Sequence, residues 1–305
     1  MGFILLVVFP FVGINFFPMS NNGNPVYRHF TRAELEREYS PSSCIPDINV
    51  FLREYAERSP AARQQCKAIT DVRYGASSEE TLDFFPAASR HAPLEVFIHG
   101  GYWQGLSKNE SCFAAPDFVH HGVAFVALNY SLAPKVNLDE IVRQCRAALA
   151  WLYQNANALG FDRQRIFISG SSAGAHLAAM TTATSWQRDF GLPDDLIKGC
   201  AAVSGIFELE PLRFTYVNEP LQLDAEAAQR NSPLFLRPVF PTALIVCWGD
   251  NETAEFKRQS REFAAAWEAR EVFEMAGYNH FDVILKLGDA ATPLGQAVLR
   301  QIGAG

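Results

Sequence analysis

The feature that most constrains the fold is a short apolar segment that runs directly into small residues and then into helix formers. It reads RIFISGSSAGAHLAAM over residues 165–180. The five residues from Gly170 to Gly174 match the pattern G-x-S-x-G, in which a strand ends, the chain turns sharply and a helix begins. Such a turn holds the hydroxyl of the central serine, here Ser172, above the edge of a sheet. The apolar flanks favour this interpretation over an inert strand-to-helix turn.

Short apolar segments alternate with helix-forming segments along most of the chain. Each apolar segment is bounded by turn residues, as buried strands are. The predicted strands cover residues 81–87, 94–101, 123–130, 165–170, 199–207, 242–249 and 272–277. The predicted helices cover residues 138–158, 173–184 and 255–270, and a last helix ends the chain. This alternation predicts an α/β fold with a mostly parallel central sheet and helices on both faces.

A single domain over residues 25–305 accounts for this pattern. The first part of that domain, residues 25–65, is charged and helix-forming, with a break around Pro41 and Pro46. Segments of this kind commonly cover a domain. We therefore expect residues 25–65 to form a helical N-terminal cap.

Residues 1–24 form an apolar leader. The part from 3 to 18 is almost wholly apolar, no Lys or Arg precedes Arg28, and Pro10 interrupts the run. A signal peptide with a basic start and a spanning helix of about 20 apolar residues both fit it poorly. Two interpretations stay open: an upstream extension ahead of a true start at Met19, and an atypical anchor or export signal.

The composition limits the kinds of molecule that we expect this protein to bind. The net charge is −7, which argues against a nucleic-acid partner or a polybasic membrane patch. The six cysteines are scattered without a CxxC pair, which indicates reduced thiols in a cytoplasmic protein and supports neither a disulfide framework nor a zinc site. We expect a small-molecule acyl substrate, no cofactor or metal, no membrane contact of the core domain, and a homodimer as one option.

A serine hydroxyl needs a base to take its proton. In hydrolases with this turn the chain order is serine, acid, histidine, and only His176 and His280 follow Ser172. His176 lies one helical turn after the serine, where a packing role is expected, so His280 in GYNHFD is the candidate base. The acid should follow the preceding strand, and Asp250 and Glu252 both lie there. These residues alone leave the choice between the two carboxylates open.

The segment FIHGGYWQG, residues 97–105, follows another predicted strand. Paired glycines let backbone amides approach a substrate closely, and such amides stabilise the oxyanion of an acyl-transfer reaction. By analogy with esterase loops of the form H-G-G, we expect the amides of Gly101 and Tyr102 to form an oxyanion hole with that of Ala173. Tyr102 and Trp103 would add an aromatic wall suited to an aryl group. A place in the core fits these two side chains equally well.

Four segments together resemble one family: HGGYW at 99–103, GSSAGAH at 170–176, EFKRQSREF at 255–263 and NHF at 279–281. They are similar to the arylformamidase branch of the α/β-hydrolases, near the hormone-sensitive-lipase-like esterases. The resemblance runs from about Tyr39 to the C-terminus. It implies an α/β-hydrolase fold, with Ser172 as nucleophile, His280 as base and the three amides named above as oxyanion hole. It also aligns Glu252 with the family's acid, which favours Glu252 over Asp250.

The chain departs from that family beside the nucleophile. Ser171 stands where the family pattern has histidine, and Ala175 stands where it has glycine. We expect Ser171 to form part of the pocket wall, so this change bears on the substrate more than on the chemistry.

The expected function is that of a serine hydrolase that cleaves an aryl amide or ester through an acyl-enzyme. An N-formyl aryl amine such as N-formylkynurenine is the first substrate class that the resemblance implies. A carboxylesterase or an amidase for another small aryl substrate is the alternative. A non-catalytic ligand-binding relic is more distant, because candidates for all three catalytic groups are present.

Overall fold

The computed structural model of the protein describes residues 23–304. Its centre is an eight-stranded sheet. The strands are β1 (Ile69–Arg73), β2 (Thr81–Phe85), β3 (Ala92–Ile98), β4 (Ala124–Leu128), β5 (Phe161–Ser171), β6 (Ile197–Val203), β7 (Ala243–Asn251) and β8 (Glu271–Asn279). Their spatial order is β1-β2-β4-β3-β5-β6-β7-β8.

The sheet is mostly parallel, as the sequence predicted. β2 pairs antiparallel with β1 and with β4, and the other neighbours all pair in parallel. The carboxyl ends of the parallel strands therefore meet at one edge of the sheet, which is where ligand sites of open α/β sheets form. The sequence did not predict β1, because most of its residues are exposed and no apolar run marks it.

Helices and short helical turns connect the strands. The α-helices are α1 (Arg32–Glu38), α2 (Asn49–Gln65), α3 (Ala115–His120), α4 (Leu138–Leu159), α5 (Ala173–Thr182), α6 (Trp186–Phe190), α7 (Asn218–Leu221), α8 (Ala225–Arg230), α9 (Ala254–Ala266) and α10 (Pro293–Ile302). The 3₁₀ turns are η1 (Pro41–Cys44), η2 (Lys108–Glu110), η3 (Glu210–Phe214), η4 (Pro233–Phe235) and η5 (Val283–Lys286).

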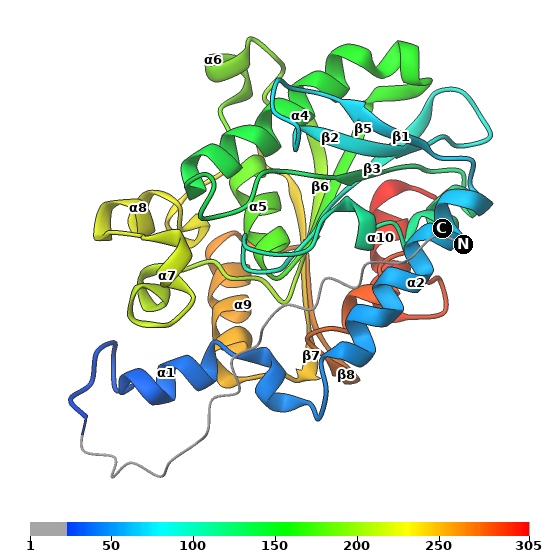
Figure 1. Cartoon of the computed structure of the whole chain (residues 1–305). Helices are drawn as coiled ribbons and strands as arrows, with labels where there is room; N and C mark the ends of the chain where they lie inside the picture. The colour runs from blue at the N-terminus through cyan, green and yellow to red at the C-terminus, as the bar shows by residue number, and fades with distance from the viewer. Residues whose placement is uncertain (1–22, 305) are drawn as a thin grey trace.

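Helical layers cover both faces of the sheet (Figure 1). Alternate residues of a strand enter different cores: Val96 and Ile98 of β3 pack with residues of α4, α5 and α9, whereas Phe97 packs with residues of α2, α3 and α10. Strands buried on both faces lack the apolar–polar alternation of half-exposed strands. This explains why their sequences are continuous apolar runs.

The segment of residues 25–65, which we call the cap, consists of α1, η1 and α2 along most of its length. Thr31 begins α1 with a reciprocal capping box, in which its side chain accepts from Glu34 N while the Glu34 carboxylate accepts from Thr31 N. The apolar leader, apart from Gly23 and Asn24, lies outside the described residues. In the part of the chain that is described, no helix is both long and apolar enough to span a membrane.

The two glycines of the G-x-S-x-G segment allow α5 to begin very close to the sheet. A Cβ on Gly174 would overlap the backbone oxygen of Ile98 in β3, and a Cβ on Gly170 would overlap the backbone oxygen of Gly174. Backbone atoms cannot move aside as a flexible side chain can. Both positions therefore need a residue without a side chain.

Replacing Gly174 with alanine should force α5 away from β3. We expect Gly174→Ala to lower the free energy of unfolding by about 3 kcal/mol, measured by urea denaturation. Gly23→Ala is the matched control, because among residues 23–304 the nearest atom to its Cβ would be Thr31 Cγ2 at 3.6 Å, and it should stay within about 0.5 kcal/mol of the parent. Equal stability of the two variants would contradict the close-approach argument.

Candidate active site

Ser172 lies in the sharp turn between β5 and α5. Its backbone has φ 57° and ψ −122°, a conformation that a non-glycine residue adopts only at a cost of about 1–3 kcal/mol. The turn is held from both sides: Ser172 N donates to Val203 O at 2.9 Å, and Ala175 N donates to Ser172 O at 3.0 Å. The residue is 8% exposed and lines the main cavity.

His280 follows β8 and makes a buried contact with a carboxylate. Its Nδ1 lies 2.9 Å from Glu252 Oε2, and both side chains are almost fully buried. With Nδ1–H donating to the carboxylate, Nε2 is left as the proton acceptor. Phe256 packs edge-on against the imidazole with ring centroids 4.5 Å apart, which restricts rotation of the ring.

The second oxygen of Glu252 is also satisfied. Glu252 Oε1 accepts from Gly249 N at 2.7 Å and from Ser204 Oγ at 2.6 Å. A buried carboxylate costs little only when such donors replace water. Sequence reasoning missed Ser204; the available signal was a serine directly after the buried run of β6.

Asp250, the alternative acid, is placed elsewhere. It belongs to the end of β7 and is exposed, and its Oδ1 accepts from Gly277 N at 2.9 Å. This contact joins the ends of β7 and β8. The structure therefore pairs His280 with Glu252. The Asp250 carboxylate instead accepts a hydrogen bond from β8 and so links the ends of β7 and β8.

The loop after β3 has an unusual backbone. Gly101, Tyr102 and Trp103 have φ of 95°, 53° and 59°, and Gly101 O accepts from Gln104 N and Gly105 N at 2.9 and 3.0 Å. Within residues 23–304, the amides of Gly101, Tyr102 and Ala173 have no hydrogen-bond acceptor. Gly101 and Tyr102 line the cavity, whereas Ala173 is fully buried, so the first two amides are the ones that a ligand in the cavity can reach.

His99 makes buried contacts that hold this loop in place. Its Nδ1 lies 2.9 Å from Gly100 O, and the ring stacks on Tyr130 with centroids 4.2 Å apart. Tyr130 OH donates to His99 O at 2.8 Å. The histidine of the H-G-G segment thus fixes the loop.

Tyr102 joins the loop to the cap. Its OH donates to Tyr39 O at 2.5 Å, and Tyr216 OH lies 3.4 Å from the same oxygen. The Tyr55 hydroxyl of α2 donates to Phe281 O, next to His280. The cap therefore contacts the segments that carry two of the candidate catalytic groups.

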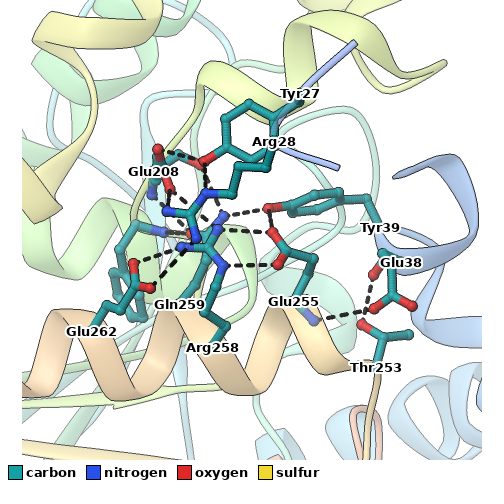
Figure 2. Close-up of polar contacts among 11 residues, drawn as sticks. Tyr27, Arg28, Glu38, Tyr39, Glu208, Thr253, Glu255, Arg258, Gln259 and Glu262 are labelled. Carbon is teal, nitrogen blue, oxygen red and sulfur yellow. Dashed lines mark hydrogen bonds and ion pairs between the residues drawn. The ribbon is translucent and has the colours of Figure 1, made fainter. Parts of the chain in front are cut away.

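A network of polar contacts joins the cap to α9 (Figure 2). Thr253 Oγ1 donates to Glu38 O at 2.6 Å, and Glu255 N donates to Glu38 Oε2 at 3.2 Å. Tyr39 OH donates to Glu255 Oε2 at 2.9 Å, and Arg258 pairs with Glu255 at 2.8 Å. Because Thr253 directly follows Glu252, these contacts also fix the segment of Glu252 against the cap.

The cavity has a volume of about 380 Å³. Apolar and aromatic side chains form most of the cavity wall, and they come mainly from the cap and from the segments that follow β3 and β8. Ser171, Ser172 and His280 lie on this wall together. Its apolar lining residues include Ile48, Leu52, Tyr55, Phe97, Leu106, Phe113, Phe281 and Ile284. A cavity of this size and lining suits a small ligand with an aromatic group.

The prediction that Trp103 lines the pocket is wrong. Trp103 is 0% exposed and packs edge-on against His176 with ring centroids 4.9 Å apart. Successive residues of the tightly turned loop point in different directions, so Tyr102 lines the cavity whereas Trp103 enters the core under α5. His176 has the packing role expected for it, with Nε2 donating to Asn231 O at 2.7 Å.

The fold and the site define an α/β-hydrolase, and solved structures agree. A protein from Silicibacter sp. TM1040 assigned as a thioesterase matches with TM-score 0.79 and 26% identity, over 87% of this chain and 98% of the other. An esterase from Pyrobaculum calidifontis matches with TM-score 0.63 and 18% identity, over 89% of this chain and 97% of the other. The latter likeness concerns the fold alone.

Sequence comparison places the chain within a family. Kynurenine formamidase from Salmo salar is 36% identical over 295 residues, which span 91% of this chain and 98% of the relative. The enzyme of the same name from Danio rerio is 35% identical over 294 residues, with the same coverage. A family model described as BD-FAE matches residues 82–202. The chain belongs to the kynurenine formamidase family, and is a hydrolase of the arylformamidase and esterase type.

Two buried histidines beside the site make stability depend on pH. Burial lowers the pKa of His176 and of His99 to about 4, against about 6.5 in an unfolded chain. The unfolded state therefore takes up protons first as the pH falls. The stabilisation that these neutral rings provide is complete above pH 6.5 and is lost as the pH falls from 6.5 to 4.

Replacing His176 with glutamine removes one of these titrations and keeps an N–H donor for Asn231 O. We expect the stability of His176→Gln to fall less than that of the parent between pH 7 and pH 4, by up to roughly 3 kcal/mol. Urea denaturation of both proteins across this range measures the difference in slope. Parallel curves would show that folding does not lower the pKa of His176, which would contradict the burial argument.

Proposed function

We propose that the protein is a serine-dependent arylformamidase that removes the formyl group from an N-formyl aryl amine such as N-formylkynurenine. The observation that carries the proposal is the common placement of Ser172 and His280 on one apolar cavity, with His280 paired to Glu252. The kynurenine formamidase relatives support the same substrate class.

In the proposed mechanism, His280 Nε2 takes the proton of Ser172 Oγ as that oxygen attacks the formyl carbon. Glu252 holds the imidazole in the required tautomer and stabilises the imidazolium. The amides of Gly101, Tyr102 and Ala173 donate to the oxyanion. The imidazolium returns the proton to the departing aryl amine, and a water activated by the same nitrogen then releases formate and Ser172.

A carboxylesterase for small aryl esters is the second candidate function. The same groups cleave an ester by the same steps, with an alcohol leaving instead of an amine. Relatives over part of the chain support it, including the esterase LipQ of Mycobacterium tuberculosis, which is 29% identical over 48% of this chain and 37% of its own. We also propose a cytoplasmic location, which the unpaired and mostly buried cysteines support.

Loss of the nucleophile is the first test. We expect Ser172→Ala to reduce kcat roughly 10⁶-fold on every substrate that the parent cleaves. Steady-state assays of parent and variant measure the change, with Ser171→Ala as the matched control on the neighbouring hydroxyl. Retention of turnover by Ser172→Ala together with its loss in Ser171→Ala would move the nucleophile to Ser171.

The acid is tested by a matched pair of amide substitutions. We expect Glu252→Gln to lower kcat roughly 10⁴-fold, because the amide favours the wrong imidazole tautomer. Asp250→Asn should stay within about threefold of the parent, since its side chain contacts the β7–β8 connection. A larger loss of kcat in Asp250→Asn than in Glu252→Gln would assign the acid to Asp250.

The substrate class is tested by a panel of formanilides, N-formylkynurenine, longer-chain anilides and p-nitrophenyl esters. The proposal expects the highest kcat/KM on the formamides. A panel in which esters react and no formamide does would support the carboxylesterase instead.

A further inference from the structure

The cavity wall carries one negatively charged side chain. Of the described residues that line it, none is Lys or Arg, and Glu110 is the one carboxylate. The histidines on the wall already have roles, since His280 pairs with Glu252 and His99 supports the loop. A carboxylate on a mostly apolar wall attracts cations and repels anions more strongly than it would in water.

Glu110 is held in place by its own segment. It ends η2, and its Oε2 accepts from Ser107 Oγ at 2.8 Å. The same turn is fastened to α2, because Arg63 donates to Lys108 O at 2.9 Å and to Asn109 O at 3.1 Å. The position of Glu110 on the wall is therefore fixed before any ligand binds.

The turn contact occupies only one carboxylate oxygen. Glu110 Oε1 has no hydrogen-bond partner within residues 23–304, in contrast to the two fully satisfied oxygens of Glu252. A glutamine could make the same contact with Ser107. Glu110 Oε1 can therefore contact a ligand while Oε2 keeps the contact with Ser107.

The neighbouring cations do not neutralise Glu110. Lys108 is directed away from it, with Nζ 2.8 Å from both Asp83 Oδ1 and Asp71 Oδ1. Arg63 Nε pairs with Asp83 Oδ2 at 2.7 Å. Both cations are committed to the carboxylates of β1 and β2, so the charge of Glu110 is available to a ligand in the cavity.

We propose that Glu110 binds an alkylammonium group of the substrate, so that the cavity selects acyl substrates whose leaving group carries a positive charge. This inference rests on the proposed function, because it places the acyl group at Ser172 and the charged end of the leaving group at Glu110. Both residues lie on the same cavity wall. The charge-assisted contact would orient the aryl amine before attack.

The test uses three formamides that share a 2-formamidophenyl ketone core and differ in the end of the side chain: a methyl group, an ammonium group or a carboxylate. For the parent protein we expect kcat/KM to fall in the order ammonium, methyl, carboxylate, with steps of roughly tenfold. A parallel set of phenyl acetates with the same three side chains is assayed beside them.

Glu110→Gln should reduce the ammonium-to-methyl ratio of kcat/KM roughly tenfold, mainly through KM. The glutamine oxygen still accepts from Ser107 Oγ, and thermal unfolding checks that the turn is intact. Glu226→Gln is the matched control, because it removes the same charge from an exposed position on α8. It should keep the ratio of the parent.

Three outcomes separate the two proposals. An ammonium preference in the parent that Glu110→Gln alone removes supports the inference. The same preference in the acetates, with no formamide hydrolysed, supports the role of Glu110 and overturns the formamidase function. Equal rates on all three side chains, or a ratio that Glu110→Gln leaves unchanged, overturns the role of Glu110 while formamide hydrolysis still stands.

Discussion

The contact between the first turn of α5 and the ends of β3 and β5 determines how the rest of the site is arranged. Because Gly170 and Gly174 have no side chains, the helix begins almost against the sheet, and Ser172 must take a strained backbone conformation to connect the two elements. The same close approach brings Gly174 against the backbone of Ile98 and His99, where the loop that follows β3 begins. The position of Ser172, the proposed nucleophile, thus follows from this packing constraint.

The second constraint is the burial of charge. Glu252 has no exposed side-chain surface, and its oxygens are satisfied by groups from the ends of β6, β7 and β8, namely Ser204, Gly249 and His280. The ends of β6, β7 and β8 must therefore lie side by side for the Glu252 carboxylate to keep these partners. The parallel sheet places the three strand ends together, and this links the fold directly to the orientation of the His280 imidazole.

The sequence predicted the sheet and most of its helices, because strands buried on both faces leave continuous apolar runs and α4 leaves a clear helical period. It could not locate β1, whose residues are mostly exposed. The residues alone left the choice between Asp250 and Glu252 open, because which carboxylate reaches His280 depends on where β7 ends and which way each side chain then points. Trp103 was assigned to the wrong environment for the same reason, since three successive positive φ angles reverse side-chain directions locally. Ser204 and Glu110 depend on contacts between distant segments, which no local pattern records.

The cap contacts three segments of the site: Tyr39 holds the loop of Tyr102, Glu38 holds the segment that follows Glu252, and Tyr55 holds the segment that follows His280. The access of a substrate to the cavity and the alignment of the groups that would attack it are therefore not independent in this protein. A change that loosens the cap to admit a bulkier acyl group also releases the groups that must be aligned for attack. Broader substrate range obtained in this way would come with slower turnover, and widening the cavity without that loss requires changes in the wall residues themselves.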